Sequence, residues 1–146
     1  MENMTIEDFI NFILDVSDER IFEEEKSGNS KICFLHGYCY EFAIVLQHFI
    51  SNSFIVINNA NDHCAIRYQG RIYDASGDIT ETFRGRIAEQ SDISHMEDRF
   101  KKKCIGGIRI SEILIKEIYQ INKDHGIFNK LPFYKKEKSQ TVKSRS

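Results

Sequence analysis

The segment from about Cys39 to Ile50 constrains the fold most strongly, because its apolar residues cover most of the circumference of a helix. The apolar positions are Phe42, Ala43, Ile44, Val45, Leu46, Phe49 and Ile50. A helix that is apolar on nearly every side needs neighbours on more than one side. The 146-residue chain is long enough for one such core. We therefore expect this helix at the centre of a single domain, residues 1–134.

Further helices are predicted at the two ends of this domain. Near the N-terminus, Thr5 and Asp8 form a capping box, apolar residues then follow one helical face, and a cluster of breakers at 27–30 should end the helix. Ser111 is predicted to cap a last helix through Asn122, with Gly126 beyond its end.

The middle of the chain predicts short strands. Apolar, partly β-branched runs lie at 54–57, 63–68 and 71–75, another at 105–110, and Ser94 is expected to cap a short helix between them. The fold class is therefore α+β: a central helix bearing Cys39 packs on a small antiparallel sheet, flanked by the N- and C-terminal helices. The polar segment 135–146 has no periodicity and is predicted to be a disordered tail.

Composition narrows the classes of function. The net charge of −2, from 20 basic and 22 acidic residues, favours neither nucleic acid nor an anionic membrane as partner. No apolar run approaches the roughly 20 residues that span a bilayer, and the first residues carry acids where a secretion signal needs bases. We expect a protein of the cytosol, of the producing cell or of a host, whose four cysteines are thiols. The basic runs 101–103 and 135–145 are interpreted as solvated surface.

Cys39 stands where the central helix begins. A thiol at a helix N-terminus faces the positive end of the helix dipole and unpaired N–H groups, which favour the thiolate and can receive an oxyanion. The residue type and its place are those of a nucleophile. The alternative is that Cys39 is one more small apolar residue of the buried stripe.

The runs on either side of Gln69-Gly70 predict a hairpin in which the side chains of His63 and Asp74 lie on the same face. In this register the two residues are diagonal neighbours, and small Ala65 lies between them. A carboxylate at Asp74 would hold one ring nitrogen of His63 and leave the other for a thiol proton. The alternative is a histidine on a solvated hairpin face and an aspartate that only forms a turn.

The segment from Gly37 to Ala43, GYCYEFA, together with the strand that starts at His63 and the segment YDASG that ends at Gly77, resembles the transglutaminase-like, papain-like cysteine superfamily. The last segment also looks like small phage and mobile-element members of that group. The resemblance implies Cys39 as nucleophile, His63 as general base and acid, and Asp74 as the orienting group. It implies an enzyme, without a cofactor, that acts on an amide bond of a protein or peptide.

Two departures from the superfamily pattern bear on the chemistry. Papain-type enzymes usually place a glutamine a few residues before the nucleophile, and the stretch from Cys33 to His36 has none. His36, Asn29 or backbone N–H groups would have to supply that hydrogen bond. The chain also lacks the tryptophan that many transglutaminases carry beside the cysteine, which favours hydrolysis or deamidation.

Two rival interpretations remain open. The first is a zinc site, because residue types that bind zinc occur at Cys33, His36 and Cys39 with His63 or Cys64, although their spacing is irregular. The second is a non-catalytic protein-binding module on the same fold, such as a phage-encoded inhibitor of bacterial defence. Neither the substrate nor the oligomeric state follows from the sequence.

Overall fold

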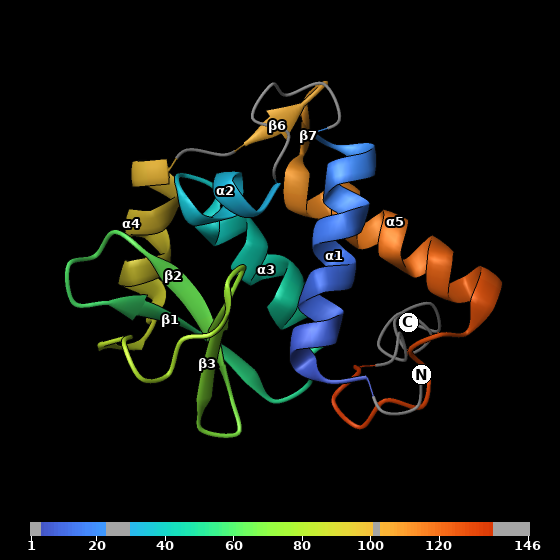
Figure 1. Ribbon diagram of the computed structural model, residues 1–146. Coiled ribbons are helices and arrows are strands. Elements are labelled where there is room, and N and C mark those ends of the chain that lie inside the picture. Colours follow the sequence, from blue (N-terminus) through green and yellow to red (C-terminus); the bar gives the residue numbers. More distant parts are fainter. Residues whose placement is uncertain (1–3, 23–29, 101–102, 136–146) are drawn as a thin grey trace, which may run out of the picture.

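The computed structural model describes residues 4–22, 30–100 and 103–135. Within these residues the chain has an α+β fold, with five helices, a five-stranded antiparallel sheet and a two-stranded hairpin (Figure 1). In chain order the elements are α1 (Ile6–Arg20), α2 (Ser30–Leu35), α3 (Cys39–Phe49), β1 (Ser53–Asn58), β2 (Cys64–Tyr68), β3 (Arg71–Asp74), β4 (Gly77–Asp78), β5 (Gly85–Ile87), α4 (Gln90–Phe100), β6 (Cys104–Ile105), β7 (Ile108–Arg109) and α5 (Ile110–His125). The strands of the larger sheet follow the order β4-β3-β2-β1-β5.

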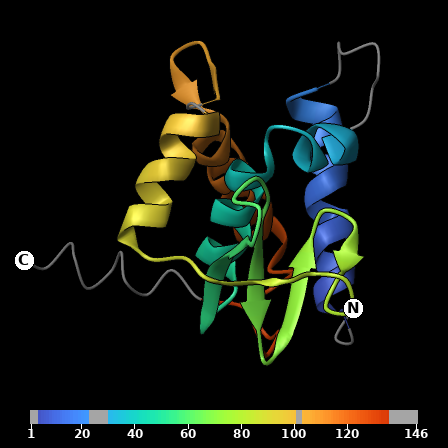
Figure 2. The ribbon, with the colours of Figure 1, turned by 90° about the vertical axis from the view of Figure 1, so that its left-hand side faces the viewer.

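The central helix is α3, as the sequence predicts. Its buried side chains point in all directions, from Phe42 and Ala43 to Leu46 and Phe49. The helix contacts β1 and β2 on one side and α5 on another. Figure 2 shows the sheet in front, with α3 and α5 behind it and α4 and α1 at the two sides. The broad apolar surface of α3 therefore has the several neighbours that it needs.

The N-terminal helix α1 begins with the predicted capping box. The Asp8 N–H donates to the Thr5 hydroxyl at 3.1 Å, and the Thr5 N–H donates to the Asp8 carboxylate at 3.0 Å. The apolar face of α1 lies in the main core, with α2 and α5 against it. The helix ends at Arg20, before the cluster of breakers that was predicted to stop it.

Helix α2 was not predicted, and it begins at one of those breakers. Ser30 starts the helix with its N–H donating to Asp18 at 2.7 Å and its hydroxyl to the Leu14 carbonyl at 3.1 Å. The other three breakers, residues 27–29, lie outside the described residues. With only six residues α2 is too short to show a periodic pattern, and contacts with α1 hold it.

The hairpin of β2 and β3 has the predicted register. Gln69 and Gly70 are the two turn residues, with φ of 50° and 78°, as a type I′ turn requires. The paired residues are Ile66 with Tyr73, Arg67 with Ile72 and Tyr68 with Arg71. The strands are slightly shorter than predicted, because His63 precedes β2 and Ala75 follows β3.

The two faces of the sheet bury different clusters. Cys64 and Ile66 belong to the main core beneath the helices. Val56 and Ala65, on the opposite face, pack against Phe83 in a small separate cluster. Phe83 belongs to the segment between β4 and β5, which crosses in front of the strands in Figure 2. This second face is therefore covered only in part.

The segment 105–110 was predicted as one strand, and most of it instead belongs to the hairpin of β6 and β7. Gly106 and Gly107 form its turn, both at positive φ, so the run reverses direction in its middle. Helix α5 then starts at Ile110, and Ser111 is its second residue and not its cap. The Ser111 N–H donates at 2.9 Å to the buried carboxylate of Glu41, which comes from α3. Gly126 ends α5 in the left-handed conformation, as predicted.

The predicted cap of α4 was also wrong. The helix begins at Gln90, and Ser94 lies inside it. The carboxylate of Asp92 accepts the N–H of Glu89 at 2.9 Å, so an aspartate already within the helix satisfies the N-terminal donor.

At the C-terminal end of the described chain, the Lys135 N–H donates to the Phe49 carbonyl at 2.6 Å. The rest of the predicted disordered tail, residues 136–146, lies outside the described residues. Among the described helices, none combines the length and the apolar character needed to cross a bilayer.

Candidate active site

His63 and Asp74 are in direct contact. Nε2 of His63 lies 2.8 Å from Oδ2 of Asp74. His63 is the residue before β2 and Asp74 the last residue of β3, so the predicted hairpin register brings them together. The Asp74 carboxylate is buried and the His63 ring is partly exposed. This contact occupies Nε2 and leaves Nδ1 as the ring nitrogen that can exchange a proton with a thiol.

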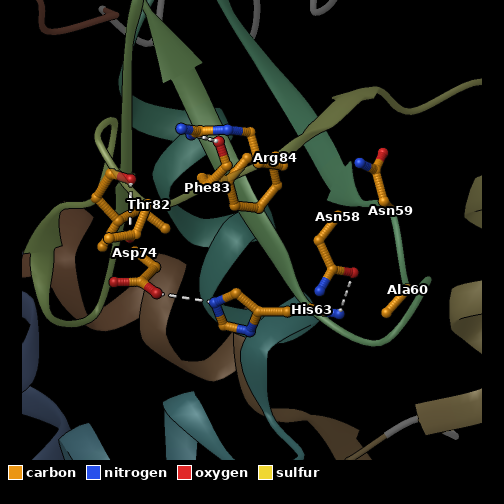
Figure 3. Close-up of a pocket in the computed structure, with 9 residues that line it drawn as sticks. Asn58, Asn59, Ala60, His63, Asp74, Thr82, Phe83 and Arg84 are labelled. Atoms are coloured by element: carbon orange, nitrogen blue, oxygen red, sulfur yellow. Dashed lines mark hydrogen bonds and ion pairs between the residues drawn. The ribbon is translucent and has the colours of Figure 1, made fainter.

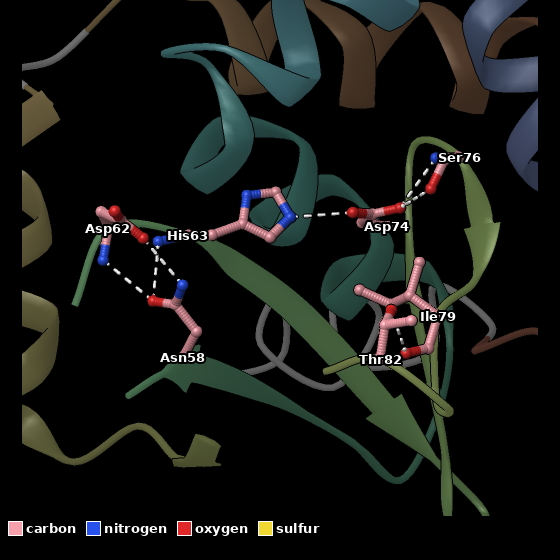
Figure 4. A network of polar contacts seen from close by, with 7 residues as sticks. All are labelled: Asn58, Asp62, His63, Asp74, Ser76, Ile79 and Thr82. Carbon is pink, nitrogen blue, oxygen red and sulfur yellow. Dashed lines mark hydrogen bonds and ion pairs between the residues drawn. The ribbon is translucent and has the colours of Figure 1, made fainter. Parts of the chain in front are cut away.

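Ser76 orients the carboxylate of Asp74 from the other side (Figure 4). Its main-chain N–H donates to Oδ1 at 2.8 Å, and its hydroxyl donates to the same oxygen at 2.6 Å. Oδ1 of Asp74 therefore accepts the hydrogen bonds from Ser76, and Oδ2 contacts His63. The sequence reasoning missed Ser76, although an Asp two residues before a Ser is the pattern of a local Asx turn.

Asn58 holds the loop that carries His63. Its Oδ1 accepts the N–H of Asp62 at 2.9 Å and that of His63 at 3.0 Å, and its Nδ2 donates to the Asp62 carboxylate at 2.7 Å. Figure 4 shows these bonds at the base of the imidazole. The sequence reasoning missed Asn58 as well. Asn58 therefore fixes the backbone of His63, and Asp74 fixes its ring.

Cys39 is the first residue of α3, and its thiol interacts with the side chains of His63 and Cys64. The structure thus brings together all three residues of the predicted triad. The Cys64 thiol is the largest influence on Cys39, and with His63 it lowers the pKa of Cys39 to about 5, although burial opposes this shift. Cys39 therefore has the acidity of an activated thiol.

The pKa of His63 moves in the opposite direction. The hydrogen bond with Asp74, followed by that with Cys39, raises it to about 10 against the effect of burial. Burial alone would raise the pKa of Asp74, but the bonds from His63 and Ser76 lower it below its usual value. These directions favour a thiolate at Cys39, an imidazolium at His63 and a carboxylate at Asp74.

The thiol of Cys64 donates to the thioether sulfur of Met96, with 3.0 Å between the two sulfur atoms. It is also the largest of the influences that lower the pKa of Cys39. The interaction with Cys39, together with burial, raises the pKa of Cys64 and favours its protonated form. No sequence pattern singled out Cys64 for this role.

A cavity of about 500 Å³ lies beside the His63–Asp74 pair (Figure 3). The residues that line it are Asn58, Asn59, Ala60, His63, Asp74, Ile79, Thr82, Phe83 and Arg84. The cavity is on the partly covered face of the sheet, where Phe83 packs on Val56. Cys39 is not among the lining residues and is 3% exposed.

The groups that could replace the missing glutamine as an oxyanion donor are His36, Asn29 and backbone N–H groups. His36 follows α2 and is exposed, and Asn29 lies outside the described residues. The N–H of Tyr38 is committed to the Cys33 carbonyl at 3.1 Å. The first-turn N–H groups of α3, starting with that of Cys39, have no acceptor within the helix and remain the nearest candidates for an oxyanion site.

The zinc interpretation requires its ligands to converge. Among the described residues, which include every residue of that proposed set, no three His, Cys, Asp or Glu side chains are grouped so that they could hold a metal ion. Two of the proposed ligands are instead engaged elsewhere, His63 by Asp74 and Cys64 by Met96.

The model of one protein family, described as Phage YunG-like protein, matches residues 17–123. The matched region is most of the chain and contains Cys39, His63 and Asp74. Comparisons with curated proteins and with solved structures gave no match. The chain belongs to the Phage YunG-like protein family.

Proposed function

We propose that this protein is a cysteine-dependent acyl-transfer enzyme, of peptidase or deamidase type, with a transglutaminase-like or papain-like arrangement of its site. Its substrate is an amide bond in a protein or peptide, and its setting is the cytosol of a cell. The observation that carries the proposal is the His63–Asp74 hydrogen bond together with the interaction of the Cys39 thiol with His63. The order of the three residues, and the directions in which their pKa values shift, support nucleophilic catalysis.

In the first step the Cys39 thiolate adds to the carbonyl carbon of the amide. The imidazolium of His63 then gives its Nδ1 proton to the leaving nitrogen, the C–N bond breaks, and a thioester remains. In the second step water loses a proton to His63 and adds to the thioester. The C–S bond breaks, and the thiolate and the imidazolium are regenerated. Asp74 holds the ring in place throughout.

Charge that develops on the carbonyl oxygen requires hydrogen-bond donors. The first-turn N–H groups of α3 supply them in this proposal, with the helix dipole favouring the same charge. The absence of a glutamine before Cys39 makes the backbone the main donor. We therefore expect a slower enzyme than one with an additional side-chain donor, by roughly 10²–10³ in turnover.

Selective alkylation tests the proposal. Iodoacetamide at neutral pH should modify Cys39 well before the exposed Cys104 in the same molecule, with the site of modification read by peptide mass spectrometry. His63→Ala and Asp74→Asn should each slow the modification of Cys39 and leave that of Cys104 unchanged. If native Cys39 reacts no faster than a free model thiol, the catalytic proposal is wrong.

A non-catalytic module that binds a protein partner is the second candidate, and one observation favours it. Cys39 is 3% exposed and does not line the cavity. Membership of a phage family fits a role such as blocking a bacterial defence protein. In that case Cys39→Ala would leave intact any effect of the protein on phage plating by a host that carries defence systems, whereas an enzyme would lose it.

A further inference from the structure

We infer that the cavity beside His63 binds an acidic segment of polypeptide, with a substrate carboxylate held by Arg84, and that Arg67, on the same face of the sheet, attracts the rest of the segment. This inference rests on the proposed function for the acyl chemistry, but the binding can be measured without turnover. It names the class of substrate: a polypeptide whose acidic side chains lie close to the amide bond that reacts.

Arg84 lies on the opposite side of the cavity lining from His63, with Phe83 between them (Figure 3). Its Nη1 donates to the carbonyl oxygens of Glu81 at 3.0 Å and Phe83 at 2.9 Å. These bonds fix the guanidinium and use only one of its nitrogens. Nε and Nη2 remain as the pair of donors that binds a carboxylate in bidentate fashion.

Arg67 adds a second positive charge to the same face of the sheet. It lies two residues after Ala65 in β2, so its side chain is on the face that Ala65 shares with Phe83. Its strand partner Ile72 bonds through its main chain to Ile79, which lines the cavity. Arg67 is exposed.

Neither arginine is neutralised within the described part of the chain. Arg71 pairs with Asp78 at 2.9 Å and Arg86 with Asp92 at 2.6 Å, whereas no described carboxylate forms an ion pair with Arg67 or Arg84. The carboxylate that lines the cavity is Asp74, and it is occupied by His63 and Ser76. Glu81, near Arg84 in the chain, acts on Arg71. The cavity is thus complementary to an anion.

Exposed apolar groups on the same face of the sheet as the cavity favour a polypeptide over a small anion. Phe54 is 51% exposed and Ile87 is 43% exposed. Ile87 pairs with Val56, and Phe54 lies two residues before Val56, so both side chains are on the same face as Phe83. An extended segment with acidic and large apolar residues would use both the arginines and this apolar surface, and would place a main-chain or side-chain amide next to His63.

Binding to the full-length Cys39→Ala variant tests the inference without turnover. The probe is a short fluorescein-labelled peptide of Glu, Leu and Gly, and its counterparts carry Gln or Lys in place of Glu. Fluorescence anisotropy should show the Glu peptide binding at least about tenfold more tightly than the Gln peptide, since a charged hydrogen bond is replaced by a neutral one. Adding Arg84→Gln should abolish that preference, and adding Arg67→Gln should reduce it.

The matched control is Arg71→Gln in the same background, because Arg71 is exposed but already paired with Asp78. It should bind the Glu peptide as the parent does. Equal affinity for the three peptides, or a Glu preference that survives Arg84→Gln, would overturn the inference. Tighter binding of a single-stranded oligonucleotide than of the Glu peptide would also overturn it, in favour of nucleic acid.

The alkylation experiment separates the two proposals. Rapid modification of Cys39 without any peptide preference would leave the enzyme standing and remove the acidic substrate. Arg84-dependent binding of the Glu peptide with an unreactive Cys39 would remove the enzyme and leave a module that captures acidic segments.

Discussion

The hydroxyl and the main-chain N–H of Ser76 both donate to one oxygen of Asp74, at 2.6 and 2.8 Å, so that the other oxygen meets His63. Ser76→Ala removes the hydroxyl and keeps the N–H. We expect a loss of about 1 kcal/mol in the free energy of unfolding and a slower alkylation of Cys39, because the carboxylate is less firmly oriented. Urea unfolding and labelling rates measure the two effects. Ser91→Ala, on the exposed surface of α4, should change neither.

The reactivity of Cys39 should follow an unusually acidic titration. Its lowered pKa means that the thiolate is present above about pH 5 and is lost as the pH falls below that value. Alkylation should therefore reach half of its plateau near pH 5. Asp74→Asn removes the strongest influence on His63, weakens the imidazolium and should move the midpoint upward. A midpoint near the ordinary thiol value of about 8.5 in the wild type would contradict this prediction.

Cys64→Ala should raise the pKa of Cys39, because the Cys64 thiol is its largest stabilising influence. The midpoint of alkylation should move to higher pH, while Cys64→Ser, which keeps a donor, should move it less. Cys33→Ala is the matched control, since it removes a thiol elsewhere in the chain. The role assigned to Cys64 fails if its alanine variant titrates like the wild type.

Asn58→Ala should loosen the loop that carries His63, because two N–H groups and the Asp62 carboxylate lose their partner. A loss of about 1–3 kcal/mol in the free energy of unfolding is expected, together with slower labelling of Cys39. Asn59→Ala provides the comparison: Asn59 is exposed, and its main-chain N–H donates to the Arg84 carbonyl at 2.9 Å. Equal effects of the two substitutions would show that Asn58 has no special role.

The shifted pKa values of Cys39 and His63 also predict how the free energy of unfolding depends on pH. The pKa of Cys39 is lowered from 9.0 to about 5, so its stabilisation is complete above pH 9.0 and is lost as the pH falls toward 5. The pKa of His63 is raised from 6.5 to about 10, so its stabilisation is complete below pH 6.5 and is lost as the pH rises toward 10. Between pH 6.5 and pH 9.0, the stabilisation gained from Cys39 as the pH rises equals the stabilisation lost from His63, so the two effects cancel.

The contribution of the pair to the free energy of unfolding should therefore be level in that range and fall on both sides. The measurement is urea unfolding of the wild type and of a double variant, Cys39→Ala with His63→Ala, at each pH. The difference between their free energies of unfolding gives the contribution of the pair. A difference that rises or falls steadily from pH 6.5 to 9.0 would show that the two groups do not titrate as a pair.

Local patterns account for the parts of the fold that the sequence could predict. The turn at Gln69-Gly70 sets the register of β2 and β3, and that register alone brings His63 to Asp74. Helix α3 was predictable because its apolar surface is continuous in the sequence. The contact between Cys39 and His63 follows only when the helix is placed on the sheet, so the sequence supported it less directly.

The errors arise where the decisive partner is remote or unremarkable. Ser111 was expected to cap α5, but its N–H is bound by Glu41, 70 positions earlier in the chain. Ser94 failed as a cap because Asp92 provides a carboxylate closer to the helix start. Asn58 and Ser76 use ordinary turn chemistry, and nothing in their spacing alone distinguishes a residue that positions His63 or Asp74 from one in a simple turn.

The bond between Glu41 and Ser111 has a consequence for synthesis of the chain. Glu41, two residues after Cys39, also pairs with Arg109 at 2.7 Å. A ribosome releases Cys39, His63 and Asp74 long before Arg109 and Ser111, so the nascent chain carries every triad residue while the carboxylate at the start of α3 still lacks its partners. Chains truncated before α5 would keep the contacts of α3 with β1 and β2 but would leave the Glu41 carboxylate without Arg109 and Ser111. We therefore expect the start of α3 to reach its final position only after the last third of the protein has been made.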